Sequence, residues 1–274
     1  MADNEGSPWT YKPNSAAAMI FLISFTLATL WHIVIIFRRR VRYFIVLAIG
    51  GALEIAGYTT RFLATRDTEN LTFFIVQTLC ILVAPALFAA SIYVVLGRLI
   101  LLLGGEAYSP VKPSRLTLIF VGGDVVTFLV QVMGSGMLRT NFTLGKTIIL
   151  VGLGAQIVFF ALFIALASVF HRRLSSKPTD QSLSMDARNG TKSWRGVMLV
   201  LYVSSALIFI RSVFRLIEFT GNRDSLLHKS EAFLYVCDSL LMLGVLAVLI
   251  YNHPSEYVPG WRAIKQMQEA EEMM

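Results

Sequence analysis

Long apolar stretches alternate with short polar segments along almost the whole chain. An apolar stretch of about 20 residues spans the hydrocarbon core of a bilayer when it forms an α-helix. Seven stretches are long enough, at residues 17–37, 43–63, 72–100, 116–137, 146–170, 196–219 and 231–251. Backbone groups in lipid must be satisfied within the chain, so the pattern predicts an all-α integral membrane protein, a seven-transmembrane-helix bundle.

The segments outside these spans are short and polar. We predict an outer N-terminal tail at residues 1–16, a flexible cytosolic loop at 171–195, and a cytosolic C-terminal tail at 252–274. The composition agrees with one membrane domain over residues 17–251, because 55% of the 274 residues are hydrophobic and only 15% are charged.

The basic residues set the predicted orientation. Fifteen of the lysines and arginines lie after the first, third and fifth spans or in the C-terminal tail, against six on the opposite side. Because cytosolic loops carry an excess of Lys and Arg, we place the N-terminus outside and the C-terminus in the cytosol. The net charge of +7 is then a topology signal that meets anionic lipid headgroups, and we expect no nucleic-acid binding. The sequons at Asn70 and Asn141 fall in the predicted outer loops.

Charged and amide side chains lie inside the apolar spans and repeat on shared helix faces. Residues seven apart, such as Glu54 and Arg61, lie nearly two turns apart on one face. A charge at the centre of a bilayer costs roughly 2.5–3.5 kcal/mol on insertion scales, so such groups pair, take up water or serve a function. We predict that these faces turn inward and form one substrate-binding site from Glu54, Tyr58, Arg61, Gln77, Asp124, Gln131, Arg211, Arg215, Glu218, Glu231, Tyr235 and Asp238.

The charges of this predicted site do not balance. It contains three arginines and five carboxylates, so two carboxylates lack a fixed partner. With the N-terminus outside, most of these residues fall in the outer half of the bilayer, which predicts an acidic polar pocket that opens outward. Such a pocket suits a cation, such as the amine headgroup of an amphiphile, or a proton relay. The alternative is a set of ion pairs that only hold helices together.

A proline at residue 85 lies midway along the third predicted span. Proline removes one backbone hydrogen bond and bends a helix. In membrane helices such a bend often marks a neighbouring cavity, and the alternative is a passive packing kink.

The sequence lacks the residues that several classes of membrane protein need for their chemistry. Only His32 of the four histidines lies within a span, which argues against a multi-histidine zinc site. The last span contains no lysine for a retinal Schiff base, and no Gly-rich Walker loop is present. We therefore predict a protein that is not an enzyme, with no catalytic residue, metal or cofactor.

Polar and small residues also recur in blocks that run in order along nearly the whole chain. The blocks are Leu53–Arg61, Gln77, Ile81–Pro85, Tyr93, Leu96–Arg98, Asp124, Gln131, Gly134–Gly136, Ile210–Ser212, Arg215, Glu218, Glu231, Tyr235, Asp238 and His253–Pro254. In these blocks the chain resembles the fungal lipid-translocating exporters, the family of aminocholesterol-resistance and sphingoid long-chain-base-resistance proteins. It departs from them at Asn222–Ser225, which lacks a glycine that the family often has in this outer loop.

The resemblance implies a seven-span protein in the plasma membrane, or an endomembrane, of a fungus. Relatives are associated with the release of sphingoid long-chain bases and with resistance to toxic amphiphiles. The resemblance also implies a shared polar core formed by Glu54, Arg61, Gln77, Asp124, Arg211, Arg215, Glu218, Glu231 and Asp238.

We therefore predict a membrane exporter of lipid-like amphiphiles, either sphingoid long-chain bases or related toxic amphiphiles. The alternative is a seven-helix sensor that binds an amphiphile and regulates lipid homeostasis or stress resistance through the loop at 171–195. The expected partners are membrane lipids and a cationic amphiphilic ligand, and the sequence names no protein partner.

Overall fold

A computed structural model describes residues 14–67, 70–138, 140–189, 193–221 and 231–254, without the side chains of residues 187–189. Seven of its helices are long and apolar enough to cross a membrane, which confirms the predicted all-α fold class. Most of the predicted tails at 1–16 and 252–274 and the segment Asn222–Ser225 lie outside the described residues.

The helices follow one another with short connections. In chain order they are α1 (Ser15–Arg39), η1 (Arg42–Phe44), α2 (Ile45–Ala64), α3 (Leu71–Leu102), η2 (Glu106–Tyr108), α4 (Pro113–Met137), α5 (Phe142–Ser176), α6 (Asp180–Asn189), α7 (Trp194–Thr220), α9 (Glu231–Leu234), the π-helical turn η3 (Tyr235–Ser239) and α10 (Leu240–Tyr251). Helix α9, η3 and α10 together form the last span, 231–251.

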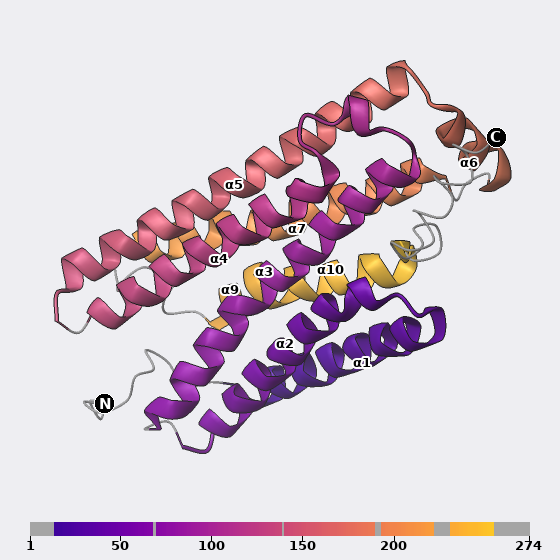
Figure 1. Ribbon diagram of the computed structural model, residues 1–274. Coiled ribbons are helices and arrows are strands. Elements are labelled where there is room, and N and C mark those ends of the chain that lie inside the picture. Colours follow the sequence, from indigo (N-terminus) through magenta and orange to yellow (C-terminus); the bar gives the residue numbers. More distant parts are fainter. Residues whose placement is uncertain (1–13, 68–69, 139, 190–192, 222–230, 255–274) are drawn as a thin grey trace.

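The spanning helices pack in a ring that follows the chain order. Each of α1, α2, α3, α4, α5, α7 and α10 contacts the next, and α10 returns to α1. Figure 1 shows the α1–α2 pair and the α4–α5 pair on opposite sides of α3. Helix α3 also contacts α7, and more of it is buried than of any other described span. Helices α3 and α7 therefore touch each other across the middle of the ring.

Close approach between neighbouring helices depends on glycine at particular positions. A Cβ atom at Gly57 of α2 would lie 2.7 Å from the Ile81 side chain of α3. A Cβ atom at Gly134 of α4 would lie 3.0 Å from the carbonyl oxygen of Gly145 in α5. Small residues of this kind let helices in a membrane pack backbone to backbone, and here they fix α2 against α3 and α4 against α5.

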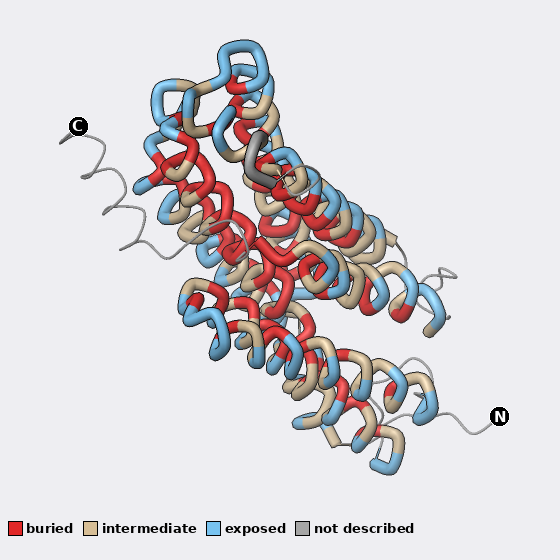
Figure 2. The backbone as a smooth tube through the Cα atoms, turned by 90° about the vertical axis from the view of Figure 1, so that its right-hand side faces the viewer, coloured by how far each residue is buried: buried red, intermediate tan, exposed pale blue. Residues whose placement is uncertain are grey.

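Large apolar side chains lie on the outside of the spanning helices, and several ionisable groups lie inside the bundle, as a lipid environment requires. Large aliphatic side chains such as Ile20, Leu118 and Leu199 are more than half exposed. Figure 2 shows the exposed residues on the outer sides of the helices and the buried ones along the inside of the bundle. Ionisable groups such as Glu54 and Arg61 are fully buried. The protein is therefore an integral membrane protein.

Much of the stretch predicted as a loop at 171–195 is helical. Helix α5 continues through Ser176, and α6 adds a short helix that ends at Asn189. The Thr179 hydroxyl joins this region to the end of α3, because it donates to the carbonyl oxygen of Leu103 at 2.6 Å. The Trp194 indole donates to Asp186 Oδ2 at 3.2 Å and ties α6 to the start of α7. The sequence signal was weak because α6 is polar on most of its surface.

Candidate functional site

Two groups of paired charges form the site, and the first lies where α2 ends and α9 begins. Arg61 of α2 forms an ion pair with Glu231 of α9. Arg61 Nε also donates to the Tyr235 hydroxyl at 3.0 Å, and that hydroxyl donates to Glu231 Oε1 at 3.0 Å. The backbone N–H of Asn14, just before α1, donates to Glu231 Oε2 at 2.9 Å. Three spans thus meet at one carboxylate.

The second group lies between α7 and the π-helical turn. Arg211 and Arg215 lie one turn apart on α7, and both form ion pairs with Asp238. Arg211 contacts Oδ1 of this carboxylate and Arg215 contacts Oδ2. Arg215 Nη1 also contacts Glu218 Oε2 at 3.0 Å. Asp238 is 1% exposed and Arg211 4% exposed, so this pairing takes place inside the protein.

Pro85 explains the position of the Arg211 side chain. A proline at residue 85 has no N–H to donate to the carbonyl oxygen four residues earlier, which is that of Ile81. Arg211 Nη2 donates to this oxygen at 2.9 Å. The guanidinium therefore links the Ile81 carbonyl oxygen, which Pro85 leaves without its helical donor, to the carboxylate of Asp238.

The π-helical turn brings further polar groups inward. π-Helical turns within α-helices are frequent at functional sites. Here the turn buries Tyr235, Asp238 and Ser239 together. The Tyr58 hydroxyl of α2 forms a short hydrogen bond with the Ser239 hydroxyl. Ser239 was not among the predicted site residues, because nothing in the apolar pattern marks the extra residue in this turn.

Glu54 is the unpaired acid of the site. Its side chain is 0% exposed, and neither carboxylate oxygen has a hydrogen-bond partner among the described residues. It interacts electrostatically with Asp238, Arg211 and Arg215. Both arginines already bind Asp238, so the Glu54 carboxylate competes for cations that are engaged elsewhere.

We call these connected side chains the charged network. It contains more carboxylates than guanidinium groups: three arginines stand against four acids. Its members are Glu54, Tyr58, Arg61, Arg211, Arg215, Glu218, Glu231, Tyr235, Asp238 and Ser239. If every group in it is ionised, the described network carries one net negative charge.

Three of the predicted site residues lie outside the charged network, and two of them make other contacts. Asp124 of α4 accepts a hydrogen bond from the Tyr93 hydroxyl of α3 at 3.0 Å. Gln131 of α4 donates to Gln156 of α5 at 3.0 Å. Gln77 is buried on α3, one turn before Ile81, and its side-chain oxygen has no partner among the described residues. Asp124 and Gln131 thus hold the α3–α4–α5 side of the bundle together.

Most of the charged network is buried among the described residues. Glu54 and Arg61 are 0% exposed, while Arg215, Glu218 and Glu231 keep about 15% of their side chains exposed. Its arginines and three of its acids contact one another in ion pairs. An outward-opening pocket at this place therefore stays a prediction.

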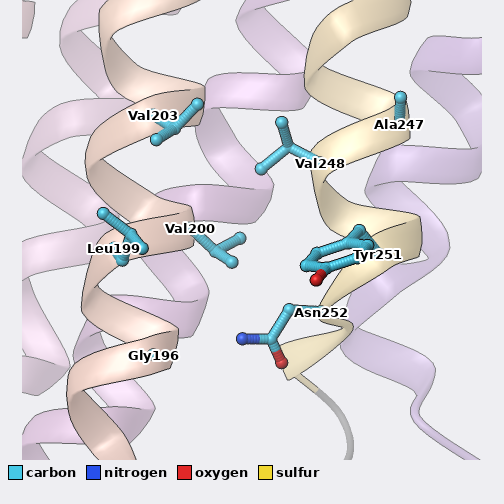
Figure 3. A pocket seen from close by; sticks show the side chains of 8 residues that line it. All are labelled: Gly196, Leu199, Val200, Val203, Ala247, Val248, Tyr251 and Asn252. Carbon is cyan, nitrogen blue, oxygen red and sulfur yellow. The ribbon is translucent and has the colours of Figure 1, made fainter. Parts of the chain in front are cut away.

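An apolar groove lies between α7 and α10, near the start of α7 and the end of α10. It has a volume of about 390 Å³. Figure 3 shows valine, leucine and alanine side chains from both helices along it, with Tyr251 and Asn252 at one end. The lining residues are Gly196, Leu199, Val200, Val203, Ala247, Val248, Tyr251 and Asn252. Val203 precedes Arg211 by eight residues, which is about 12 Å along a helix.

Comparisons with known proteins place this architecture among fungal membrane proteins. A family model described as "RTA1 like protein" matches residues 47–260. The chain is 33% identical to Protein RTA1 of Saccharomyces cerevisiae, over 93% of this chain and 87% of that protein. It is 31% identical to Protoporphyrin uptake protein 1 of the same organism, over 80% and 70% of the two chains.

A third relative has a name that concerns a lipid. The chain is 24% identical to the sphingoid long-chain base transporter RSB1 of Saccharomyces cerevisiae, over 88% of this chain and 72% of that protein. No solved structure matches the chain.

Proposed function

Because the chain belongs to the RTA1-like family of membrane proteins, whose named members include lipid transporters, we propose that it exports lipid-like amphiphiles with a cationic headgroup. Sphingoid long-chain bases are the substrate class that this proposal favours. The function needs no catalysis, and the proposed place of action is the plasma membrane.

The buried Glu54 carboxylate is the observation that carries this proposal. A charge inside a protein is strongly unfavourable unless it is paired. Glu54 has no hydrogen-bond partner among the described residues, and the network around it has one more acid than base. One lipid ammonium group beside Glu54 supplies the missing positive charge. A headgroup with a single amine therefore fits this site.

The apolar groove provides for the hydrocarbon part of the same molecule. The groove lies between α7 and α10, and the charged network lies around α7, α2, α9 and η3, which continues into α10. In the predicted orientation the network lies towards the outer leaflet and the groove towards the cytosol. A lipid with its amine at Glu54 and its chain along α7 and α10 then has the orientation of a lipid in the outer leaflet.

Release to the outside requires the charged network to open at its partly exposed members. Glu231 binds the start of α1 through the Asn14 N–H and the end of α2 through Arg61. Separation of α9 from these two partners would uncover the network on the predicted outer side. We propose this end as the exit and the gap between α7 and α10 as the route of the chain.

The experiment compares purified wild-type protein with the Glu54→Gln variant in liposomes. A fluorescent sphingoid base reports transbilayer movement, and an N-acylated analogue without the positive charge serves as the matched substrate control. We expect movement of the free amine by the wild type, little movement of the N-acylated analogue, and at least a tenfold slower rate for Glu54→Gln. Glu106→Gln, which removes an exposed carboxylate from the η2 loop, should behave as wild type.

Four results would speak against the proposal. Equal rates for Glu54→Gln and wild type would remove Glu54 from the binding site. Equal movement of the N-acylated analogue would show that the charge is not recognised, and so would movement of an anionic porphyrin in preference to the amine. Saturable binding of the base without movement would favour the amphiphile sensor over the exporter.

A further inference from the structure

We propose that Glu54 is an exchange site that holds either one proton or one lipid ammonium group, so that each amine leaving the cell is coupled to one proton entering it. The inference rests on the proposed function and adds the coupling ion and the stoichiometry.

Two guanidinium groups and one carboxylate face Glu54, so its charge balance depends on which acids those guanidinium groups already bind. From α7 it faces Arg211 and Arg215, and from the π-helical turn it faces Asp238. From α3 it faces the Cys80 thiol, which is neutral as a thiol. Tyr58, one turn along α2, also interacts with Glu54 and is hydrogen-bonded to Ser239.

Neither arginine is free to neutralise Glu54. The Arg211 guanidinium divides its contacts between Asp238 and the carbonyl oxygen of Ile81. Arg215 lies between Asp238 and Glu218. Two guanidinium groups therefore serve two other carboxylates, and the third carboxylate, Glu54, needs a cation from outside the set.

Two cations meet this need, and they exclude each other. A proton on Glu54 makes the carboxyl neutral, and an ammonium group beside the ionised carboxylate makes a neutral pair. In both states the site has the same total charge, so the structure around it tolerates either. A site that is neutral only with a proton or an amine favours an exchange of one for the other.

The exchange has a direction when the outside is more acidic than the cytosol. On the cytosolic side, an ammonium group binds and the Glu54 proton leaves to water. On the outer side, a proton from water binds to Glu54 and the ammonium group leaves with its lipid. One positive charge crosses in each direction, so the cycle is electroneutral and is driven by the pH gradient rather than by the membrane potential.

The test uses a permanently charged probe, the N,N,N-trimethyl derivative of a fluorescent sphingoid base. This probe cannot cross a membrane as a neutral free base, so its movement reports the protein alone. Proteoliposomes contain a pH-sensitive dye, and the potential is set independently with potassium and valinomycin. We expect probe entry to follow an imposed pH gradient, to be insensitive to the potential, and to be matched by one proton leaving per cation entering.

Each outcome separates this inference from the proposed function. Protein-dependent probe movement that follows the potential without proton counterflow would keep the exporter and overturn the exchange. Protein-dependent movement of neither the probe nor the primary amine would overturn both. Glu54→Gln should lose the proton counterflow as well as the probe movement, while Glu106→Gln should keep a ratio of one to one.

Discussion

Removal of the Arg211 side chain tests whether Pro85 and the charged network act together. Arg211→Met keeps much of the side-chain length but removes both contacts, to Asp238 and to the carbonyl oxygen of Ile81. Breaking a buried ion pair costs about 3–5 kcal/mol, and leaving a buried carbonyl oxygen unpaired costs about 1–3 kcal/mol. Arg215 still holds Asp238, so we expect a loss near the lower limit, about 4 kcal/mol.

A second substitution separates the two contributions. Pro85→Ala gives residue 85 an N–H, which can donate to the Ile81 carbonyl oxygen and close the gap in the helix ladder. In the Arg211→Met background this bond replaces the one that was lost. We therefore expect Pro85→Ala to restore about 1–3 kcal/mol more in that background than in the wild type. Any general gain from removing a proline is the same in both backgrounds and cancels in the double-mutant cycle.

The measurement is the free energy of unfolding of the four proteins in detergent micelles, followed by far-ultraviolet circular dichroism. Val83→Ala, on the same helix as Pro85, replaces Pro85→Ala in a control cycle and should show no coupling. Strict additivity of Arg211→Met and Pro85→Ala would refute the reasoning, because the two residues would then not share the Ile81 oxygen.

Other expected outcomes test the packing of α2 against α3, the buried Asp124 and the apolar groove. Gly57→Ala places a Cβ atom 2.7 Å from a side chain of α3 and should destabilise the protein by about 1–3 kcal/mol. The control Gly154→Ala meets nothing within 4 Å and should leave the stability unchanged, and thermal unfolding measures both variants. Tyr93→Phe removes the hydrogen bond to buried Asp124 and should cost about 1–3 kcal/mol in the same assay, and no loss would show that this acid has another partner. Val203→Trp fills the groove and should slow the movement of long-chain amines at least several-fold while short-chain amines still bind, whereas equal slowing of both would separate the groove from the lipid chain.

The helix faces could be predicted from the sequence, but the partners could not. The seven-residue spacing of Glu54 and Arg61 correctly placed both on the inner side of α2, since both are buried. Their partners depend on how far each helix is shifted along its neighbours, and one sequence carries no signal for that shift. Asp124 is an example. In the sequence it has the same apolar surroundings as Glu54, but in the structure it accepts a hydrogen bond from Tyr93, whereas Glu54 has no such partner among the described residues.

The local irregularities of the helices were also partly hidden. Pro85 predicts from the sequence that the Ile81 carbonyl oxygen lacks its helical donor, because a proline removes the hydrogen bond to the residue four positions earlier. The sequence does not predict that Arg211 donates to this oxygen instead. The π-helical turn at Tyr235–Ser239 has no sequence signature of its own, so the inward position of Ser239 could only be read from the structure.

One side chain joins the two irregular helices at the level of the charged network. Arg211 contacts the carbonyl oxygen freed by Pro85 and the carboxylate of Asp238 in the π-helical turn. A bundle selected only for stability gains little from such an arrangement, because well-packed apolar residues often replace buried ion pairs without loss. An exporter, by contrast, must reorganise its charges each time the cargo enters and leaves. Helices with interrupted hydrogen-bond ladders bend most readily at those points, and here both interruptions share Arg211 beside the unpaired Glu54. A cation bound at Glu54, as we propose, would thus act where the fold is best able to respond to it.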